Sequence, residues 1–444
     1  MPSAVAGYAP NLDKYLKSLK GQPLDLSIEN LVSLLKRRQI KGAEPCAVAT
    51  AHIILQVVAR SKWQNVDSLL DNVSRVGRKL ASAAPTELVI GNIVRRVLGL
   101  IRDEAAEDRN EPQSEDPSDG HATPPDAVPN STVAKQDSAG DYLNNSPGPQ
   151  SRPGLFVSQS AVNIPKSLFH LLSASPPADP DHVPGSPFAG SGTSTPQHHK
   201  NSSSQVHALR SEVIDGIEEI KDEISQVDDQ IAALADVQIH SGDYLLVHRP
   251  SPTVERFILR AALKRKFTVL IVTEPPRKHL AEVQHASFRK KLAAAKITVV
   301  NILNGGLMAY MARVDKVILG AAAIVANGGV ISDAGAAAIA RAAKESGNAV
   351  IVLGGIYKLS PETPFGEDEV IEWADPSSYV DFADGQLVGS IDVRTAATEM
   401  VPADLIDTYV TNLGTHTRDH LSTLIADHYK PEDIDFHLWD DARR

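Results

Sequence analysis

Apolar residues in the first hundred positions recur at spacings of three and four, which is the period of an amphipathic helix. In segment 24–38 this spacing places four leucines on one side, and cations gather at the end of the segment, where they suit the helix dipole. Three further segments follow the same period, and Thr86 is placed to cap the last of them: 47–63, 66–82 and 87–104. Residues 1–107 are therefore predicted to form an all-helical domain.

The helical pattern stops at about residue 108, and Pro, Ser, Gly, Asp and Asn dominate the chain as far as residue 205. Such a segment cannot bury enough apolar surface to offset the entropy lost on ordering. We therefore predict that 108–205 is a disordered acidic linker rich in proline and serine. One apolar island inside it, IPKSLFHLL at 164–172, is a candidate for docking on a folded domain.

Helical periodicity returns in 206–234, where apolar residues alternate steps of four and three, as in the seam of a coiled coil. The seam consists of Val213, Ile217, Ile220, Ile224, Val227, Ile231 and Leu234. Two explanations stay open, because only about three heptads are present. The helix either forms a coiled coil with another chain or lies along its own domain.

Strand and helix patterns alternate from residue 241 onward. Short apolar runs predict strands at 244–248, 267–273, 297–302, 316–319 and 349–353. Helices are expected between them, at 253–264, 280–295, 306–311 and 333–346, and the tail 402–439 reads as helix and loop. This alternation is typical of a parallel sheet covered by helices. Residues 206–444 are therefore expected to form a long helix followed by a Rossmann-like α/β domain.

Composition narrows the possible functions. The chain of 444 residues carries a formal net charge of −11, so its composition does not point to direct nucleic-acid binding through a basic surface. Cys46 is the single cysteine, so an internal disulfide and a thiolate metal site are excluded, and a cytosolic location is expected. The N-terminal sequence does not read as a signal peptide, and no apolar run reaches about 20 residues, so we expect no membrane insertion.

The glycine-rich loop 320–329 is the strongest local candidate for ligand binding. It has neither the GxGxxG pattern of dinucleotide sites nor the GK[ST] ending of a P-loop. Ser332 can cap a helix that begins at Asp333, and the N-terminus of that helix can hold an anion, but a tight glycine turn is the simpler explanation. The loop HRPSP at 248–252 has prolines where a dinucleotide fingerprint would need backbone donors.

His416 and His420 stand four residues apart, a spacing that suits a metal ion on a helix. The residues between them differ from HExxH and no third ligand is evident, so surface or capping histidines are the simpler interpretation. No serine, cysteine or carboxylate stands in a recognisable catalytic arrangement. We therefore predict no catalytic residues, no metal and no cofactor.

Several segments resemble the homologous alpha, beta and delta subunits of translation initiation factor 2B. VDKVILGAAAIVANGGVISDAG at 314–335 and YKLSP at 357–361 resemble the whole group. RSKWQNVDSLL at 60–70 and GNIVRRVLGLIRDE at 91–104 are similar to its beta members. The resemblance implies a cytosolic, non-catalytic regulatory subunit of the guanine nucleotide exchange factor for initiation factor 2. It further implies pairing with a delta subunit, assembly with alpha, gamma and epsilon subunits, and sensing of the phosphorylated alpha subunit of factor 2 in the stress response, while exchange itself belongs to epsilon.

The same family is related to sugar-phosphate isomerases that act on methylthioribose-1-phosphate and ribose-1,5-bisphosphate, which gives an alternative function. Those enzymes resemble one another in a Thr-His-Cys strand end and a Gly-Ala-Asp-Arg loop. Here the first reads Val247-His248-Arg249, and the second has Ala322 in place of the acid. The phosphate loop, at 275–279, lacks the Gln-Gly that follows it in the isomerases. Because an alanine cannot transfer a proton, a ribose-1-phosphate type isomerase is disfavoured.

The resemblance also suggests where partners bind. The predicted subunit interface surrounds the first strand and consists of His240, Ser241, Gly242, Asp243, Tyr244 and Leu246. The helical domain is the expected contact with the alpha subunit of factor 2, through Arg37, Arg38, Arg95 and Arg96. Ordinary surface charge explains these arginines equally well, because arginine is mostly exposed in proteins.

Overall fold

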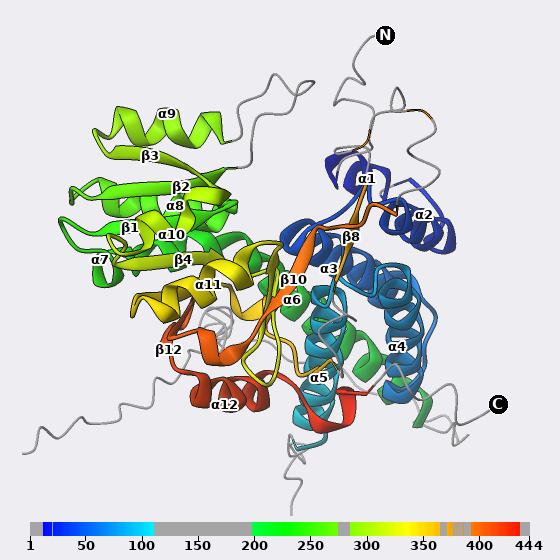
Figure 1. Cartoon of the computed structure of the whole chain (residues 1–444). Coiled ribbons are helices and arrows are strands. Elements are labelled where there is room, and N and C mark those ends of the chain that lie inside the picture. Colours follow the sequence, from blue (N-terminus) through cyan, green and yellow to red (C-terminus); the bar gives the residue numbers. More distant parts are fainter. Residues whose placement is uncertain are drawn as a thin grey trace, which may run out of the picture. The chain divides into compact units, whose positions relative to one another are not determined.

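The computed structural model describes residues 12–19, 21–110, 198–273, 285–364, 371–375, 380, 385 and 392–435, apart from the side chains of 108–110 and 198–205. The island at 164–172 and the loop at 275–279 lie outside these residues. Met1–Pro112 and Gln197–Arg444 fall within one compact unit. Figure 1 shows its N-terminal helices in blue to cyan and the central strands mostly in green. No helix in the part of the chain that the structure describes is long and apolar enough to cross a membrane.

The N-terminal part is helical, as the apolar period predicts. Its described elements are α1 (Leu12–Ser18), α2 (Leu24–Lys36), α3 (Ala43–Arg60), α4 (Val66–Ala83) and α5 (Val89–Asn110). The helix α3 begins four residues before its predicted start, because Pro45 lies in the first turn, where no intrahelical donor is needed. Asn65 caps α4 by accepting a hydrogen bond from the Ser68 N–H at 3.0 Å, in a capping box.

The turn before α5 differs from the prediction. Thr86 does not cap the helix, which begins at Val89. Its hydroxyl instead accepts a hydrogen bond from the Arg38 guanidinium at 3.3 Å, and Glu87 accepts one from the Gly42 N–H at 2.8 Å. The turn between α4 and α5 is therefore hydrogen-bonded to the turn between α2 and α3. These contacts are distant in sequence, so the local pattern could not predict them.

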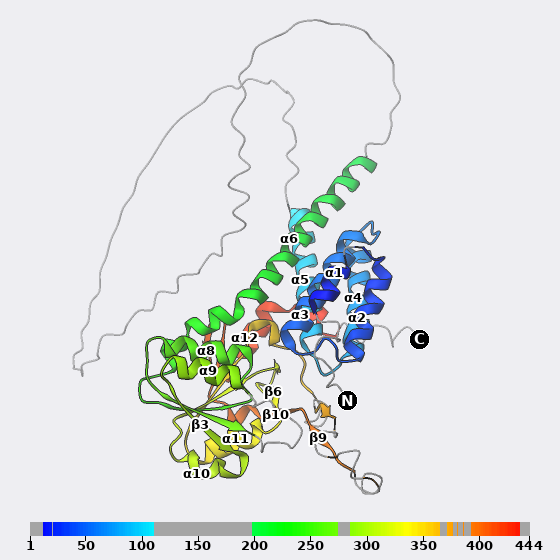
Figure 2. The same ribbon diagram turned by 90° about the horizontal axis from the view of Figure 1, so that it is seen from above.

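The long helix α6 (His198–Ala233) lies along its own chain. Six of the seven seam residues are buried, between 0% and 7% exposed, and Leu234 is partly buried against the same core. The helix packs on α3, α5 and α8 (Pro252–Ala262), and Figure 2 shows it running past these elements. Of the two explanations for the heptad pattern, the structure supports packing within the chain. The short helix α7 (Ala235–Gln238) follows it.

A seven-stranded sheet forms the centre of the C-terminal part, in the order β12-β11-β7-β4-β1-β2-β3. Its strands are β1 (Tyr244–His248), β2 (Thr268–Thr273), β3 (Thr298–Leu303), β4 (Lys316–Gly320), β7 (Ala349–Leu353), β11 (Thr408–Thr411) and β12 (Gly414–His416). All neighbours are parallel except β11 and β12. The chain proceeds from β1 outward to β3 and then crosses to β4 on the other side of β1, so the switch point lies between β1 and β4. The predicted Rossmann-like fold class is confirmed.

Alternate residues of the strands supply two cores on opposite faces of the sheet. Leu245 and Val247 of β1 join a core that also contains α8, α9 (Ala286–Ala294), α6 and the N-terminal helices. Leu246 joins a second core with α10 (Leu307–Met311), α11 (Ala336–Glu345) and α12 (Arg418–His428). The N-terminal helices therefore share one hydrophobic core with a face of the sheet.

The tail 402–439, predicted as helix and loop, also contains β11 and β12, and for the residues of these two strands the prediction is wrong. Both β11 and β12 belong to the main sheet, and β10 (Thr398–Val401) pairs with β6 (Val330–Asp333) in a small sheet that includes β5 (Ala323–Ile324). A two-stranded ladder joins β8 (Trp373–Ala374) to β9 (Thr395–Ala396). These strands are two to four residues long, so their apolar pattern is too short to detect and pairing with distant residues decides their conformation.

Candidate functional site

A cavity of about 460 Å³ lies at the carboxyl end of β4, next to the switch point of the sheet. Its wall includes residues 320–322 at the end of β4, Ile331 and Asp333 of β6 in the small sheet, and residues 251–253 at the N-terminus of α8. Residues 41–45, from the turn after α2 and the first turn of α3, also line the cavity. Doubly wound α/β proteins bind ligands at this position, so this cavity is the first place to look for chemistry.

Ala322 and Arg249 both reach the carboxyl edge of the sheet. Ala322 lies on the cavity wall, where its N–H donates to the Ile331 carbonyl oxygen at 2.8 Å and its methyl group offers neither a donor nor an acceptor. Arg249 follows β1 directly with a φ of 39°, in the left-handed region that side chains other than glycine rarely adopt. The interpretation of these two residues as replaced catalytic positions stays a prediction.

Asp333 and two histidines are electrostatically coupled at this edge. Burial raises the pKa of Asp333, and the charge of Arg249 opposes that rise, as do His248 and His285 in their protonated forms. Burial also lowers the pKa of His248, whose Nε2 lies 2.8 Å from the carbonyl oxygen of Ala334. His248 is therefore neutral near pH 7 and donates from Nε2, since a carbonyl oxygen can only accept. This hydrogen bond anchors the imidazole through Nε2.

Lys358, in the 3-10 turn η2 (Ile356–Lys358), is a buried cation at the base of the cavity. Its side chain ammonium donates to the Ala321 carbonyl oxygen at 2.9 Å, and the residue is only 6% exposed. Burial lowers the pKa of Lys358, whereas the carboxylates of Asp228, Glu44 and Glu87 raise it. The hydrogen bond thus joins the 3-10 turn η2 to the chain just after β4. The sequence shows it only as part of YKLSP, a family motif with no evident chemistry.

The glycine-rich loop forms a turn and a short strand, and the predicted helix start at Asp333 is wrong. The strand β6 continues to Asp333, and α11 begins at Ala336. Ser332 does not cap this helix, because its hydroxyl donates to the Gly320 carbonyl oxygen at 2.9 Å. Gly335, with a φ of 101°, makes the break between strand and helix at a conformation that glycine adopts without strain.

Glu399 of β10 occupies the N-terminus of α11. Its Oε1 accepts hydrogen bonds from the N–H groups of Gly335 at 2.9 Å and Ala337 at 2.7 Å. A helix N-terminus favours a negative charge through its dipole and its free donors. The chain's own carboxylate therefore stands where the sequence suggested an external anion.

Replacing Glu399 tests this contact. We expect Glu399→Ala to lower the free energy of unfolding by about 2 kcal/mol, because two N–H groups lose their acceptor. Glu399→Gln keeps an acceptor oxygen and loses only the charge at the helix end, which costs about 0.5 to 1 kcal/mol. Urea denaturation at pH 7 measures both. Equal losses for the two variants would contradict the assigned hydrogen bonds.

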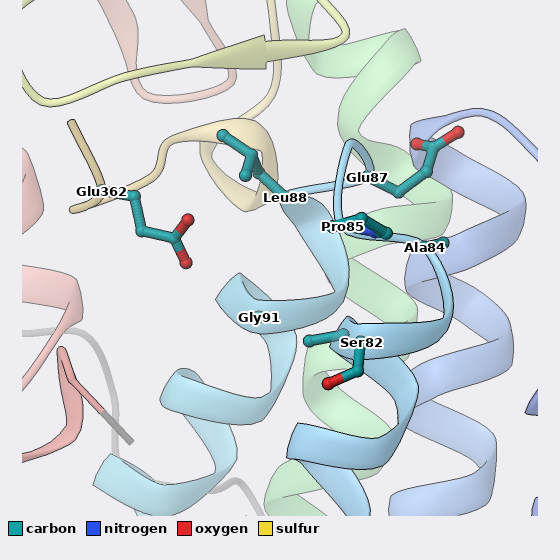
Figure 3. A pocket seen from close by; sticks show the side chains of 8 residues that line it. Ser82, Ala84, Pro85, Glu87, Leu88, Gly91 and Glu362 are labelled. Atoms are coloured by element: carbon teal, nitrogen blue, oxygen red, sulfur yellow. The ribbon is translucent and has the colours of Figure 1, made fainter. Parts of the chain in front are cut away.

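Arg95 and Arg96 have internal partners. Arg95 is 1% exposed, and its guanidinium pairs with Glu362 at 2.5 Å and donates to the Ile434 carbonyl oxygen at 3.0 Å. Figure 3 shows Glu362 facing Gly91 of α5 across a cavity of about 240 Å³, and a Cβ atom at position 91 would lie 2.9 Å from Arg95. Arg96 pairs with Glu223 of α6 at 2.6 Å. The structure thus gives both arginines a role inside the chain.

Arg37 and Arg38 are exposed at the end of α2. Arg38 forms an ion pair with Glu372, next to β8, and Arg37 makes no ion pair with the described residues. Of the four arginines predicted to form one contact, Arg95 and Arg96 are therefore paired inside the chain, and Arg37 and Arg38 are exposed at the surface.

The residues of the predicted interface segment differ in their exposure to solvent. His240, Ser241, Gly242 and Tyr244 are exposed, whereas Leu246 is fully buried in the second core. Burial would raise the pKa of Asp243, but hydrogen bonds from Lys316 and the His240 N–H outweigh it and lower the pKa. Asp243 thus holds the loop in place.

His416 and His420 lie with their rings stacked, 5.1 Å apart at the centroids and 7° from parallel. The Nε2 of His416 is 2.9 Å from the Thr411 hydroxyl, which occupies one ring nitrogen. Within the described residues, no group of three or more His, Cys, Asp or Glu could hold a metal ion. The pair is better explained by packing at the start of α12.

Residues 39–418 match the initiation factor 2 subunit family. The chain is 32% identical over 416 residues to the translation initiation factor eIF2B subunit beta of Schizosaccharomyces pombe, covering 92% of this chain and 96% of that protein. It is also 30% identical over 214 residues to the ribose 1,5-bisphosphate isomerase of Pyrococcus furiosus, which covers 48% of this chain and 65% of the isomerase.

Among solved structures, the chain is similar to one from the tetrameric eIF2B-beta2-delta2 complex of Chaetomium thermophilum. The identity is 40%, the TM-score is 0.63, and the match covers 95% of this chain and all of that one. The likeness extends over the N-terminal helices and the sheet, whereas the isomerase matches less than half of the chain. The chain therefore belongs to the initiation factor 2 subunit family and, within it, to the eIF2B beta subunits.

Proposed function

We propose that this chain is a non-catalytic regulatory subunit of the guanine nucleotide exchange factor for translation initiation factor 2. In this role it pairs with a delta subunit, joins alpha, gamma and epsilon subunits, and helps to sense the phosphorylated alpha subunit of factor 2. The observation that carries the proposal is the 40% identity to a chain from a beta2-delta2 complex, over 95% of this chain and the whole of that one. Ala322 and the filled N-terminus of α11 support a surface-based role over isomerase chemistry.

The amino edge of the sheet offers a surface for the delta subunit. Three large apolar side chains are exposed there: Val237 at 66%, Tyr244 at 41% and Leu263 at 72%. Two contacts bring their segments together, because Lys264 pairs with Asp236 at 2.5 Å and the Gly242 N–H donates to the Lys266 carbonyl oxygen at 2.8 Å. We call Val237, Tyr244 and Leu263 the amino-edge patch. Exposed apolar groups with a polar rim are typical of protein interfaces.

The ordered loop beside the patch fits an interface. Asp243 accepts hydrogen bonds from the His240 N–H and from Lys316, at 2.8 and 2.6 Å, so His240 and Ser241 are presented in a fixed conformation. A preorganised loop loses less entropy on binding than a free one. We therefore keep His240, Ser241, Gly242 and Tyr244 as interface residues, with Asp243 as their support and Leu246 as a core residue.

Co-expression tests the proposal. The chain is produced with delta, gamma and epsilon subunits, the mass of the assembly is measured, and GDP release from factor 2 is assayed with and without phosphorylation of its alpha subunit. We expect co-purification and an exchange rate that depends on this chain. A chain that never co-purifies, or that turns over ribose 1,5-bisphosphate, would overturn the proposal.

A paired substitution locates the surface. Tyr244→Asp with Leu263→Asp is expected to weaken assembly with delta by more than about tenfold, because it places two charges in an apolar contact. The matched control is Leu303→Asp, which changes an apolar side chain of similar exposure, 52%, on the edge strand β3. If the control weakens assembly as much as the paired variant, the amino-edge patch is not the contact.

A further inference from the structure

Two exposed features meet at the rim of the 460 Å³ cavity. The first, which we call the basic turn, is the end of α2 and the turn after it, with Lys36, Arg37, Arg38 and Lys41 all exposed. The second is the indole of Trp373 in β8, which is 56% exposed. Arg38, Lys41 and Glu372 line the same cavity, so the residue before Trp373 lies against the basic turn.

Arg38 holds the residue that precedes Trp373. The ion pair between Arg38 and Glu372 ties β8 to the basic turn, and the Glu372 N–H donates to the Thr398 hydroxyl at 3.1 Å. The strand that carries the indole is thus held from two sides (Figure 1), by the basic turn and by β10. A tryptophan on a fixed strand loses little freedom when it binds, which favours an aromatic anchor.

The backbone conformation of Arg38 is also fixed by the end of α2. Its φ is 54°, at the position after a helix C-cap where glycine is usual. The N–H groups of Arg38 and Gln39 both close the end of α2, on the carbonyl oxygens of Leu35 and Leu34 at 2.9 Å. The left-handed conformation is higher in free energy for arginine than for glycine. With this backbone the Arg38 guanidinium contacts Glu372 and Thr86.

The charges left on this surface are mostly positive. Glu372 is paired with Arg38, and Glu87 accepts the Gly42 N–H. Lys36, Arg37 and Lys41 make no ion pair with the described residues. The acids nearest to them in the chain are Glu29, which pairs with Lys79, and Glu44. A small cationic surface on a chain with a net charge of −11 fits a local acidic contact better than the broad basic stripe that nucleic acid requires.

We propose that the basic turn and Trp373 form one docking surface for an acidic segment of a partner protein. Anionic oxygens, from carboxylates or a phosphorylated side chain, bind Arg37 and Lys41, and an apolar side chain of the segment packs on the indole of Trp373. Arg38 is a positioning residue that acts through Glu372. This inference deepens the factor 2 contact proposed above and rests on that proposal for the identity of the partner, whereas the surface itself can be tested without it.

The charge around Trp373 can be measured by fluorescence quenching of the full chain. Trp63 is only 5% exposed, and Trp439→Phe removes the remaining tryptophan, so quenching reports Trp373. We expect iodide to quench more strongly than caesium, and Arg37→Glu with Lys41→Glu to reverse that order. Equal quenching by both ions, or no change in the double variant, would overturn the proposal.

Binding is tested with two fluorescein-labelled peptides, one of Asp and Glu with a central Leu, the other with a phosphoserine replacing one Asp. Anisotropy is expected to show binding that weakens about tenfold or more in Trp373→Ala and in Arg37→Glu. Lys290→Glu, an exposed cation on α9, is the control and is expected to leave binding unchanged. The peptide that binds more tightly identifies the anion. Binding that is unchanged in both Trp373→Ala and Arg37→Glu, or that weakens equally in the Lys290→Glu control, would sink the proposal.

A charge exchange separates positioning from contact. Arg38→Glu is expected to weaken peptide binding, and Arg38→Glu with Glu372→Arg to restore it, because the ion pair that holds β8 is rebuilt. A direct contact at Arg38 would not be restored by this exchange. If the chain assembles with delta and affects GDP release but fails these tests, the docking surface is wrong and the proposed function stands.

Discussion

Replacing Arg102 by methionine is expected to lower the free energy of unfolding by about 3 kcal/mol, because the change leaves a buried carboxylate without its counter-ion. Arg102 of α5 binds Asp433 in the 3-10 turn η7 (Pro431–Asp433) through Nε at 3.1 and 3.2 Å and through Nη2 at 3.0 Å. The Asp433 side chain is 3% exposed. Chemical denaturation of the full chain measures the loss, and limited proteolysis reports release of the segment after α12.

The partner substitution is the control. Asp433→Asn is expected to cost less, about 1 kcal/mol, because the amide oxygen still accepts a hydrogen bond and Arg102, 38% exposed, regains water. The sum of the losses of unfolding free energy in the two single variants is expected to exceed the loss in the double variant Arg102→Met with Asp433→Asn, because both substitutions remove the same interaction. Equal costs for Arg102→Met and Asp433→Asn would show that the carboxylate is not effectively buried.

Gly355→Ala is expected to destabilise the chain by about 2 kcal/mol through overpacking. A Cβ atom at this position would lie 2.4 Å from Cγ1 of Val227 on α6 and 2.9 Å from the Tyr357 ring. The Gly355 backbone is extended, with a φ of −68°, so the cost is steric and owes nothing to backbone strain. Thermal and chemical unfolding of the full chain measure it.

A second substitution can relieve this overlap. Val227→Ala alone is expected to cost about 2 kcal/mol by leaving a cavity, but the pair Gly355→Ala and Val227→Ala is expected to cost less than the sum of the two. Gly21→Ala is the matched control, because a Cβ atom there meets nothing within 4 Å. Additive losses in the double variant would mean that α6 does not approach Gly355 as closely as described.

The sequence is sufficient for elements whose pattern is continuous and local. The bounds of β1 and β7 agree with the prediction, since strands covered on both faces are short unbroken apolar runs. It is insufficient for β6 and β10, which pair across the chain and replace the expected start of a helix at Asp333. Their residues acquire strand structure from each other, and a window of neighbouring residues does not contain that information.

The candidate site shows the same division. Ala322 and Arg249 could be singled out from family motifs, and both lie at the carboxyl edge of the sheet. Glu399 and Lys358 could not, although the first fills the N-terminus of α11 and the second lies buried beneath the cavity. A glutamate or a lysine in sequence reads as surface charge, because nearly all such residues are exposed.

By itself the sequence determined the α/β fold class, the helical N-terminal part and the resemblance to initiation factor 2B subunits, because apolar period and family motifs are local properties of the chain. Only the tertiary structure decided that the seam of α6 faces its own core and that Arg95 is buried while Arg37 is exposed. Burial and charge pairing depend on residues that folding brings together, as with Arg102 and Asp433, which are 331 positions apart. Whether a charge serves a partner or the fold itself is therefore decided by distant neighbours, and only the folded chain shows which of them it meets.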